Sequence, residues 1–233
     1  MRKTLILILA LMLPFGLVSC RGAEAETPDD TEDAIVTTDA SVTTPEETTE
    51  EPAPVIEITQ VDGITYINGI LIANKTYGLP ADYDPGLDPT ASAALAQMQM
   101  AAAAEGIELF TVSGYRSYSY QETLYNNYVA RDGQAAADRY SARPGYSEHQ
   151  TGLAFDLNSL EESFGETREG IWLKEHCFEY GFIIRYPKEK EAETGYMYEP
   201  WHVRYLGKDV AKSVYESGLC LEEYLDITSV YAD

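Results

Sequence analysis

The stretch "SEHQTGLAFDL", residues 147–157, places a histidine, a glycine and an aspartate at fixed intervals and then becomes apolar. Apolar side chains at every second position of residues 153–157 predict a strand with one buried face, and they place Asp156 on the other face. Gly152 allows a sharp turn before the strand, so His149 can fold back beside Asp156. Taken alone, the segment favours a loop histidine and a strand aspartate that face solvent.

A second motif, "EPWHVRYLG" at residues 199–207, supplies another histidine and an acid. Pro200 is incompatible with a regular central strand, so the chain is expected to bend or to begin pairing there. In a regular strand Glu199 and His202 would point to opposite faces, and only a bend at Pro200 could bring both into one cleft. By itself the motif also fits a strand-start acid followed by a partly buried histidine.

Together the two motifs offer three nitrogen and oxygen ligands, His149, Asp156 and His202, and a carboxylate outside that set, Glu199. Three protein ligands with one open position are what a catalytic zinc ion requires, because the metal lowers the pKa of a water molecule to about 7. The separate carboxylate can accept a proton from that water and pass it to a leaving amine. The combination therefore predicts a zinc hydrolase site.

A third motif, "SGYRSYSYQ" at residues 113–121, lies where a predicted buried strand, residues 107–115, meets a predicted helix. Arg116 can enter a cleft there and form paired hydrogen bonds with a carboxylate or a developing oxyanion. Gln121, about one helical turn further on, could reach the same pocket. The alternative is a solvated surface arginine, which is the commoner fate of this residue type.

The remainder of the folded region mixes helices with short strands. The dipeptides Asp62-Gly63 and Asn68-Gly69 divide the beginning of the domain into hairpin strands. We expect Thr90 or Ser92 to cap a first helix that ends at Gly106. Further helices are expected at residues 117–133, 170–181 and 208–218, and strands at 182–187 and 201–207, with loops or turns at 134–146, 188–198 and 219–225.

This order lacks strict strand–helix alternation and predicts an α+β fold. We expect a single compact domain, residues 55–233, with a small, mainly antiparallel sheet packed by helices and zinc in a cleft on the sheet. Cys177 and Cys220 could pair outside the cytoplasm, or they could be two buried free thiols, which we favour. The formal net charge of −23 opposes binding to phosphate backbones, so no nucleic-acid partner is expected. We expect a monomer.

The N-terminus has the pattern of an export signal. Residues 1–19 contain two basic residues and an apolar run that ends in "LVSC", residues 17–20. This resembles a bacterial lipoprotein signal, in which Cys20 is lipidated and becomes the new N-terminus; a plain secretory signal is the alternative. Residues 20–54 carry eleven acidic side chains and one Arg, which predicts a disordered linker. We therefore expect an extracytoplasmic domain, lipid-anchored to the bacterial membrane.

The three motifs, together with "YGFIIRYP" at residues 180–187, resemble the VanY-type D-alanyl-D-alanine carboxypeptidase family, which is related to D,D-dipeptidases and to the Hedgehog signalling domain. Residues 147–156 match the signature Ser-x-His-x-x-Gly-x-Ala-x-Asp in full, and residues 199–202 match Glu-x-x-His. The resemblance spans residues 71–224. It implies Zn²⁺ as the cofactor, bound by His149, Asp156 and His202. It also implies that Glu199 is the proton carrier.

The resemblance also implies roles for other residues. Arg116 would stabilise the oxyanion and orient the substrate, whereas Gln121 and Ser147 would line the pocket near the C-terminal end of the substrate. His176 matches no metal position and is expected to be structural.

The function that the resemblance implies is removal of the C-terminal D-alanine from peptidoglycan stem peptides of the cell wall by a zinc metallopeptidase. An L,D-carboxypeptidase that acts on tetrapeptide stems is an alternative, because such relatives share the "SEHQTG" and "EPWH" motifs. A noncatalytic lipoprotein that binds wall peptides in the same cleft is an alternative from a different class.

Overall fold

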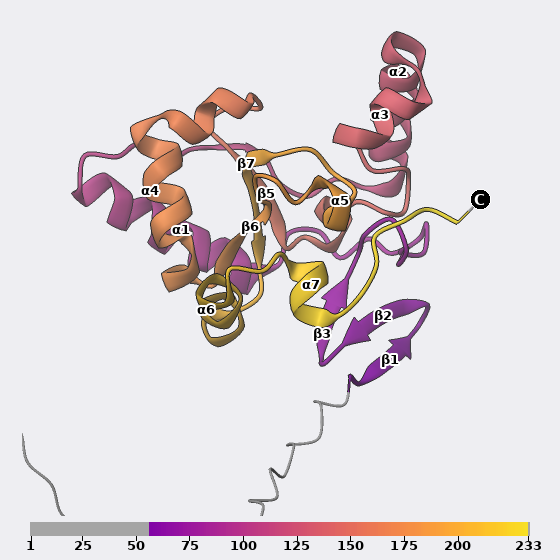
Figure 1. The fold of residues 1–233 in the computed structure, drawn as a ribbon, viewed down its shortest axis with the longest axis horizontal. Coiled ribbons are helices and arrows are strands. Elements are labelled where there is room, and N and C mark those ends of the chain that lie inside the picture. The colour runs from indigo at the N-terminus through magenta and orange to yellow at the C-terminus, as the bar shows by residue number, and fades with distance from the viewer. Residues whose placement is uncertain (1–55, 233) are drawn as a thin grey trace, which may run out of the picture. The chain divides into compact units, whose positions relative to one another are not determined.

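The computed structural model describes residues 56–232 of the 233-residue chain (Figure 1). The predicted signal peptide, the lipidated Cys20 and the acidic linker fall on residues 1–54 and lie outside the described residues. Within residues 56–232, no helix is both long enough and apolar enough to cross a membrane.

The described chain opens with an antiparallel meander of three strands, β1 (Ile58–Val61), β2 (Ile64–Ile67) and β3 (Ile70–Ile72). The two predicted hairpin dipeptides form its turns. Asp62 and Gly63 have φ of 51° and 79°, and Asn68 and Gly69 have φ of 50° and 78°. Positive φ at both central residues is what a tight two-residue hairpin turn requires, so the prediction of hairpin strands here is confirmed.

A second sheet has the antiparallel order β4-β5-β7-β6 and carries the residues of all three motifs at or near its strands. Its strands are β4 (Thr111–Ser113), β5 (Ala154–Leu157), β6 (Phe182–Tyr186) and β7 (Glu199–Tyr205). In the ladder between β5 and β7, Asp156 lies directly opposite His202. A central pair of strands therefore places residues from two distant motifs side by side.

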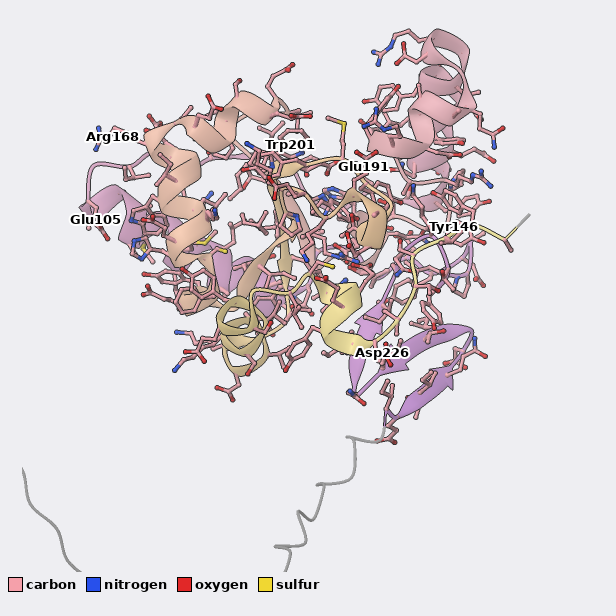
Figure 2. The ribbon with its side chains drawn as sticks, viewed as in Figure 1. Glu105, Tyr146, Arg168, Glu191, Trp201 and Asp226 are labelled. Carbon is pink, nitrogen blue, oxygen red and sulfur yellow. The ribbon has the colours of Figure 1, made fainter. Side chains whose placement is uncertain are left out.

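One face of this sheet packs against α1 (Pro89–Ala104) and α4 (Arg168–His176). Phe155 and Val203 share the core there with Met98 of α1. Figure 2 places Glu105 and Arg168, at the ends of these two helices, on the opposite side of the sheet from Glu191.

The opposite face of the sheet is also covered, so the prediction that β5 has only one buried face is wrong. All four residues of β5 are buried. On this side Ile183 of β6 joins a cluster with Ile67 of the meander and with residues of α6 (Lys208–Ser217) and α7 (Leu221–Leu225). Polar residues that the alternation places on this face are therefore removed from solvent.

Several helices form where expected. The helix α2 (Tyr118–Asp132) has Ser117 as its N-cap and ends at Gly133, and α1 ends just before Gly106. The predicted cap of α1 is wrong, because Asp88 caps this helix, and its side chain accepts a hydrogen bond of 2.8 Å from the backbone N–H of Ala91. The reason is Pro89, which is suited to the first helical position and so moves the cap one residue earlier.

Other local predictions are corrected by packing. Of the buried strand expected at residues 107–115, only the short, largely exposed edge strand β4 forms. Ile107 and Leu109 are buried, but they precede the residues that pair with β5. The third helix continues past α4 as a 3₁₀ turn, Cys177–Tyr180. Three stretches expected as loops or turns contain helices: α3 (Gln134–Tyr140), α5 (Glu191–Thr194) and α7. Cys177 and Cys220 are buried free thiols, as favoured.

Candidate metal and catalytic site

Two paired strands and the turn that precedes one of them bring the three predicted ligands together. Asp156 of β5 lies opposite His202 of β7, and a 3₁₀ turn, Glu148–Thr151, carries His149 to the same place. One ligand atom from each of these residues lies within 4.8 Å of the others. All three side chains are buried, so the group is sheltered from bulk water.

Gly152 makes the turn between His149 and β5 possible. Its φ is 74°, in the left-handed region that favours glycine. A Cβ atom at this position would lie 2.1 Å from the carbonyl oxygen of Gly86 and 2.9 Å from the backbone nitrogen of Asp88. The residue therefore serves two purposes, since it turns the chain and lets the loop before α1 pack against it.

We predict that Gly152→Ala lowers the free energy of unfolding by more than the roughly 1–2 kcal/mol that a left-handed conformation costs, because the new Cβ collides with backbone. The measurement is chemical denaturation. Gly218→Ala is the matched control: Gly218 also has a left-handed φ of 69°, but among the described residues no atom lies within 4 Å of a Cβ built there. Equal losses in the two variants would contradict the assigned collision.

The two histidine rings are oriented by different partners. Nδ1 of His149 lies 2.6 Å from the carbonyl oxygen of Gly114, which can only accept, so Nδ1 carries the proton and Nε2 is left facing Asp156 Oδ2 at 3.3 Å. In His202 the arrangement is reversed: Nε2 lies 3.2 Å from Glu148 Oε2, and Nδ1 faces Asp156 Oδ1 at 3.3 Å. Both rings thus direct a nitrogen at the same carboxylate.

This arrangement fits a cation. Asp156 Oδ1 is buried and has no hydrogen-bond partner among residues 56–232. When Nε2 of His202 carries the ring proton, Nδ1 is a lone pair that faces this oxygen, and two buried acceptors at 3.3 Å need a positive charge between them. Two imidazole nitrogens and one carboxylate form a donor set suited to zinc.

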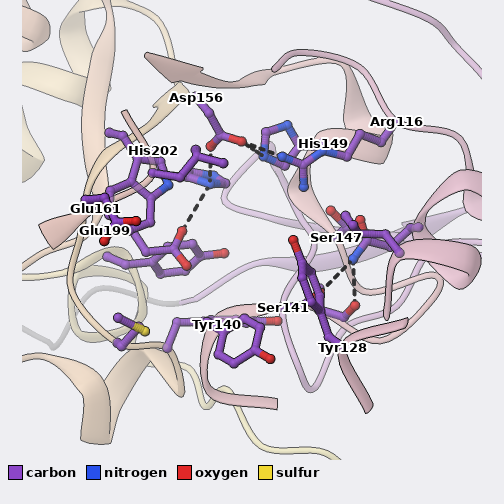
Figure 3. A pocket seen from close by; sticks show the side chains of 18 of the residues that line it. Arg116, Tyr128, Tyr140, Ser141, Ser147, His149, Asp156, Glu161, Glu199 and His202 are labelled. Atoms are coloured by element: carbon purple, nitrogen blue, oxygen red, sulfur yellow. Dashed lines mark hydrogen bonds and ion pairs between the residues drawn. The ribbon is translucent and has the colours of Figure 1, made fainter. Parts of the chain in front are cut away.

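Glu199 reaches the group through an irregularity in β7. Ile184 pairs with Val203 while Tyr186 pairs with Glu199, so β7 accommodates two additional residues around Pro200. Glu199 Oε2 comes to 3.5 Å from Nδ1 of His202, and Figure 3 shows both side chains on one wall of the pocket. The predicted bend at Pro200 is confirmed.

Burial and neighbouring charges shift the proton affinities of the group. Burial, reinforced by the negative charge of Asp156, raises the pKa of Glu199 to about 8. Burial lowers the pKa of His202, but the neighbouring carboxylates of Asp156 and Glu148 outweigh it and raise that pKa to about 9. Burial and the charge of Arg116 lower the pKa of His149. In the metal-free protein at neutral pH, His202 and Glu199 therefore both hold protons.

We predict that zinc binding at pH 7 releases at least one proton, because a metal ion can bind Nδ1 of His202 only after the imidazolium loses its charge. In the metal-free protein the pKa values of Glu199 and His202 are raised to about 8 and about 9. Zinc affinity should therefore increase as the pH rises from about 6 to about 9. Calorimetry in two buffers with different ionisation enthalpies measures the release. A binding enthalpy that is independent of the buffer would contradict this prediction.

Arg116 lies at the mouth of the site and is not a solvated surface residue. Its guanidinium forms an ion pair with Asp156 Oδ2, its Nε donates to Ser113 Oγ at 2.9 Å, and its side chain is 18% exposed. Together with Gln121 and Ser147 it lines a cavity of about 410 Å³ that also contains the ligand group and Glu199. The structure therefore brings all predicted substrate-contacting residues to one cavity.

Gln121 lines this cavity and carries an acceptor without a partner among the described residues. Its Nε2 donates to the carbonyl oxygen of Ala142 at 2.8 Å and lies 3.3 Å from Ser141 Oγ. Its Oε1 is buried and lacks a hydrogen-bond partner within the described part of the chain. A free amide oxygen suits an N–H group of a peptide rather than a carboxylate. Tyr128 and Tyr140 line the end of the cavity away from the ligand group (Figure 3).

Sequence reasoning missed Glu148, which lies between two predicted site residues. This carboxylate is buried and accepts hydrogen bonds from the two buried arginines Arg185 and Arg204 as well as from His202. The signal was present, since both arginines occur in predicted strands where a buried charge requires a partner. His176 is not part of the site, and its Nδ1 lies 2.9 Å from Glu179 Oε1.

Comparison with known proteins identifies relatives of this chain. The sequence model of the family VanY, D-alanyl-D-alanine carboxypeptidase, matches residues 84–208. A D-alanyl-D-alanine carboxypeptidase of Enterococcus faecalis is 34% identical over 176 residues, which are 67% of this chain and 65% of the relative. The matched region spans about two thirds of the length of this relative and of a second curated relative.

Solved structures resemble a large part of the chain. The LdcB LD-carboxypeptidase, solved to show peptidoglycan recognition, is 48% identical with a TM-score of 0.70, and the match covers 76% of this chain and 98% of LdcB. A mutant of the vancomycin-resistance D,D-pentapeptidase VanY, in complex with Zn(II), is 37% identical with a TM-score of 0.60, covering 66% of this chain and 97% of VanY. The expected α+β fold with small antiparallel sheets is therefore confirmed.

Proposed function

Because the chain belongs to the VanY family of D-alanyl-D-alanine carboxypeptidases, we propose that it is a zinc-dependent peptidase that removes the C-terminal D-alanine from peptidoglycan stem peptides. The observation that supports this most strongly is the buried group of His149, Asp156 and His202 with Glu199 beside it. A solved VanY structure contains Zn(II), and the donor set of this chain suits the same ion.

In this proposal the three ligand residues hold the metal and Glu199 moves the proton. A zinc ion held by these residues would supply Lewis-acid chemistry for the scissile carbonyl and would lower the pKa of water at neutral pH. Glu199 accepts a proton from the attacking water and delivers it to the leaving amine. Its position suits both steps, because Glu199 lines the cavity beside the ligand group, with Oε2 3.5 Å from Nδ1 of His202.

The other cavity residues bind and orient the peptide. Arg116 is held beside Asp156, and its guanidinium remains partly exposed, so it can stabilise negative charge that develops on the carbonyl oxygen. Gln121 offers its free Oε1 to a backbone N–H of the substrate. Ser147, also buried in the wall, adds a hydroxyl near the same end of the cavity.

Similarity favours an L,D bond in a tetrapeptide stem as the substrate. The LdcB match has higher identity and covers more of this chain than the VanY match, and an L,D-carboxypeptidase DacB from Streptococcus pneumoniae gives comparable values. The D,D bond of a pentapeptide stem remains the second candidate, because the family and the E. faecalis relative are described by that activity.

Mass spectrometry of the products tests the proposed function. The zinc-loaded protein is incubated separately with tetrapeptide and pentapeptide muropeptides. We expect loss of one alanine from the tetrapeptide to be faster. Loss of alanine mainly from the pentapeptide would reverse the choice of bond, and no loss from either peptide would contradict the proposed function.

We also propose that the domain acts outside the cytoplasm and is tethered by lipidated Cys20, where stem peptides are accessible. Support comes from the lipoprotein-like sequence that ends at Cys20. Cell fractionation tests this proposal: the protein should sediment with membranes, and recovery in the cytosolic fraction would contradict it.

A further inference from the structure

Glu148 stands behind the metal group, away from the cavity. It opens the 3₁₀ turn that carries His149, it is 2% exposed, and it is not among the residues that line the cavity. The ring of His202 lies between Glu148 and Asp156, with Nδ1 toward Asp156 and Nε2 toward Glu148. The side chain of Glu148 thus meets the ligand group at His202.

Two guanidinium groups fix the charge and the orientation of this carboxylate. Glu148 Oε1 accepts hydrogen bonds from Arg185 Nε at 2.7 Å and from Arg204 Nη1 at 2.8 Å. Its other oxygen, Oε2, is thereby directed at Nε2 of His202, 3.2 Å away. Because arginine remains protonated, Glu148 stays ionised and can act only as an acceptor toward the ring.

Each of the two arginines also donates hydrogen bonds to a second partner. Arg185 donates to both carboxylate oxygens of Glu222 on α7, at 2.7 and 2.5 Å. Arg204 donates to the carbonyl oxygen of Leu71 in β3 at 2.6 Å. Glu222 and Leu71 lie outside residues 84–208, the part of the chain that the family model matches. The two guanidinium groups are therefore held by elements at both ends of the described domain.

We propose that Glu148 is a positioning residue that holds His202 with Nε2 protonated, so that Nδ1 is the nitrogen presented to the metal. The inference rests on the proposed zinc-dependent function. A carboxylate that accepts the free N–H of a ligand histidine fixes the tautomer and increases the basicity of the coordinating nitrogen. His149 is held by the backbone oxygen of Gly114 instead, so only His202 depends on a side chain that substitution can change.

The test is the zinc affinity of Glu148→Gln, measured by competition with a chromophoric chelator. We expect zinc to bind about 10–100-fold more weakly than in the wild type, the usual cost of losing such a partner. Glu222→Gln is the matched control, because it makes the same change in an equally buried carboxylate that also binds Arg185 but does not contact His202. Its affinity should change less than about 3-fold.

A second measurement does not require the variant to fold. Nitrogen-15 spectra of the histidines in the zinc-loaded wild type should show His202 coordinated through Nδ1 with a proton on Nε2, and His149 with the opposite arrangement. Coordination of His202 through Nε2 would overturn the inference.

The outcomes separate the inference from the proposed function. If the wild type binds zinc and Glu148→Gln binds it equally well, or if Glu222→Gln weakens binding as much as Glu148→Gln does, Glu148 has no specific positioning role. If the wild type binds no zinc, the proposed function itself fails, and the inference fails with it.

Discussion

Replacing Glu199 by Gln is expected to lower kcat by roughly 10²–10⁴-fold, the usual contribution of a positioned proton carrier, and to leave zinc bound. The amide keeps the size of the side chain but can neither accept a proton from water nor deliver one to the leaving amine. Glu199 is not among the three grouped ligand residues, and its Oε2 lies 3.5 Å from Nδ1 of His202.

Steady-state kinetics with a stem-peptide substrate, together with the zinc content of the same preparation, provide the test. The loss should fall on kcat while KM changes little, because the proton is transferred only in the transition state. A bound zinc ion shows that the site is intact. Full turnover in a zinc-loaded Glu199→Gln protein would remove Glu199 from the mechanism.

Replacing Asp156 by Asn is expected to abolish both zinc binding and turnover. Asp156 is the only acid in the ligand group that the described residues form, and its two oxygens lie 3.3 Å from nitrogens of His149 and His202. A neutral amide removes the negative charge that offsets a buried dication. The loss of zinc affinity should therefore exceed the roughly 10–100-fold that loss of a partner outside the ligand group costs.

Asp138→Asn is the control for this change. Like Asp156, Asp138 is bound by a guanidinium, that of Arg143; it is partly buried and accepts a hydrogen bond from Tyr125. It lies away from the ligand group, so zinc affinity and kcat should remain near wild-type values in this variant. Stoichiometric zinc in Asp156→Asn with unchanged affinity would show that the ligand set is assigned incorrectly.

The members of the site could be predicted from the sequence because two motifs carry them at recognisable spacings. Their burial could not. The alternation in β5 correctly places Asp156 on the face opposite Phe155, but it gives no information about what covers that face. The cover includes the meander, α6 and α7, which come from the two ends of the described chain. Contacts at such separations leave no periodicity in the sequence.

Glu148 shows the same limit inside a motif that was otherwise interpreted correctly. Its position next to His149 reveals nothing about its partners, which are Arg185, Arg204 and His202 in β6 and β7. Only the pairing of these strands around the 3₁₀ turn brings the charges together. The local prediction at Pro200 succeeded, by contrast, because proline restricts the backbone wherever it occurs.

The most direct test of the zinc site is a crystallographic anomalous difference map of the zinc-loaded protein, recorded at the zinc absorption edge. We predict one strong peak at bonding distance, about 2.0–2.2 Å, from Nε2 of His149, a carboxylate oxygen of Asp156 and Nδ1 of His202. A zinc-loaded crystal with no peak there, or with its peak at other residues, would contradict the assignment of this site.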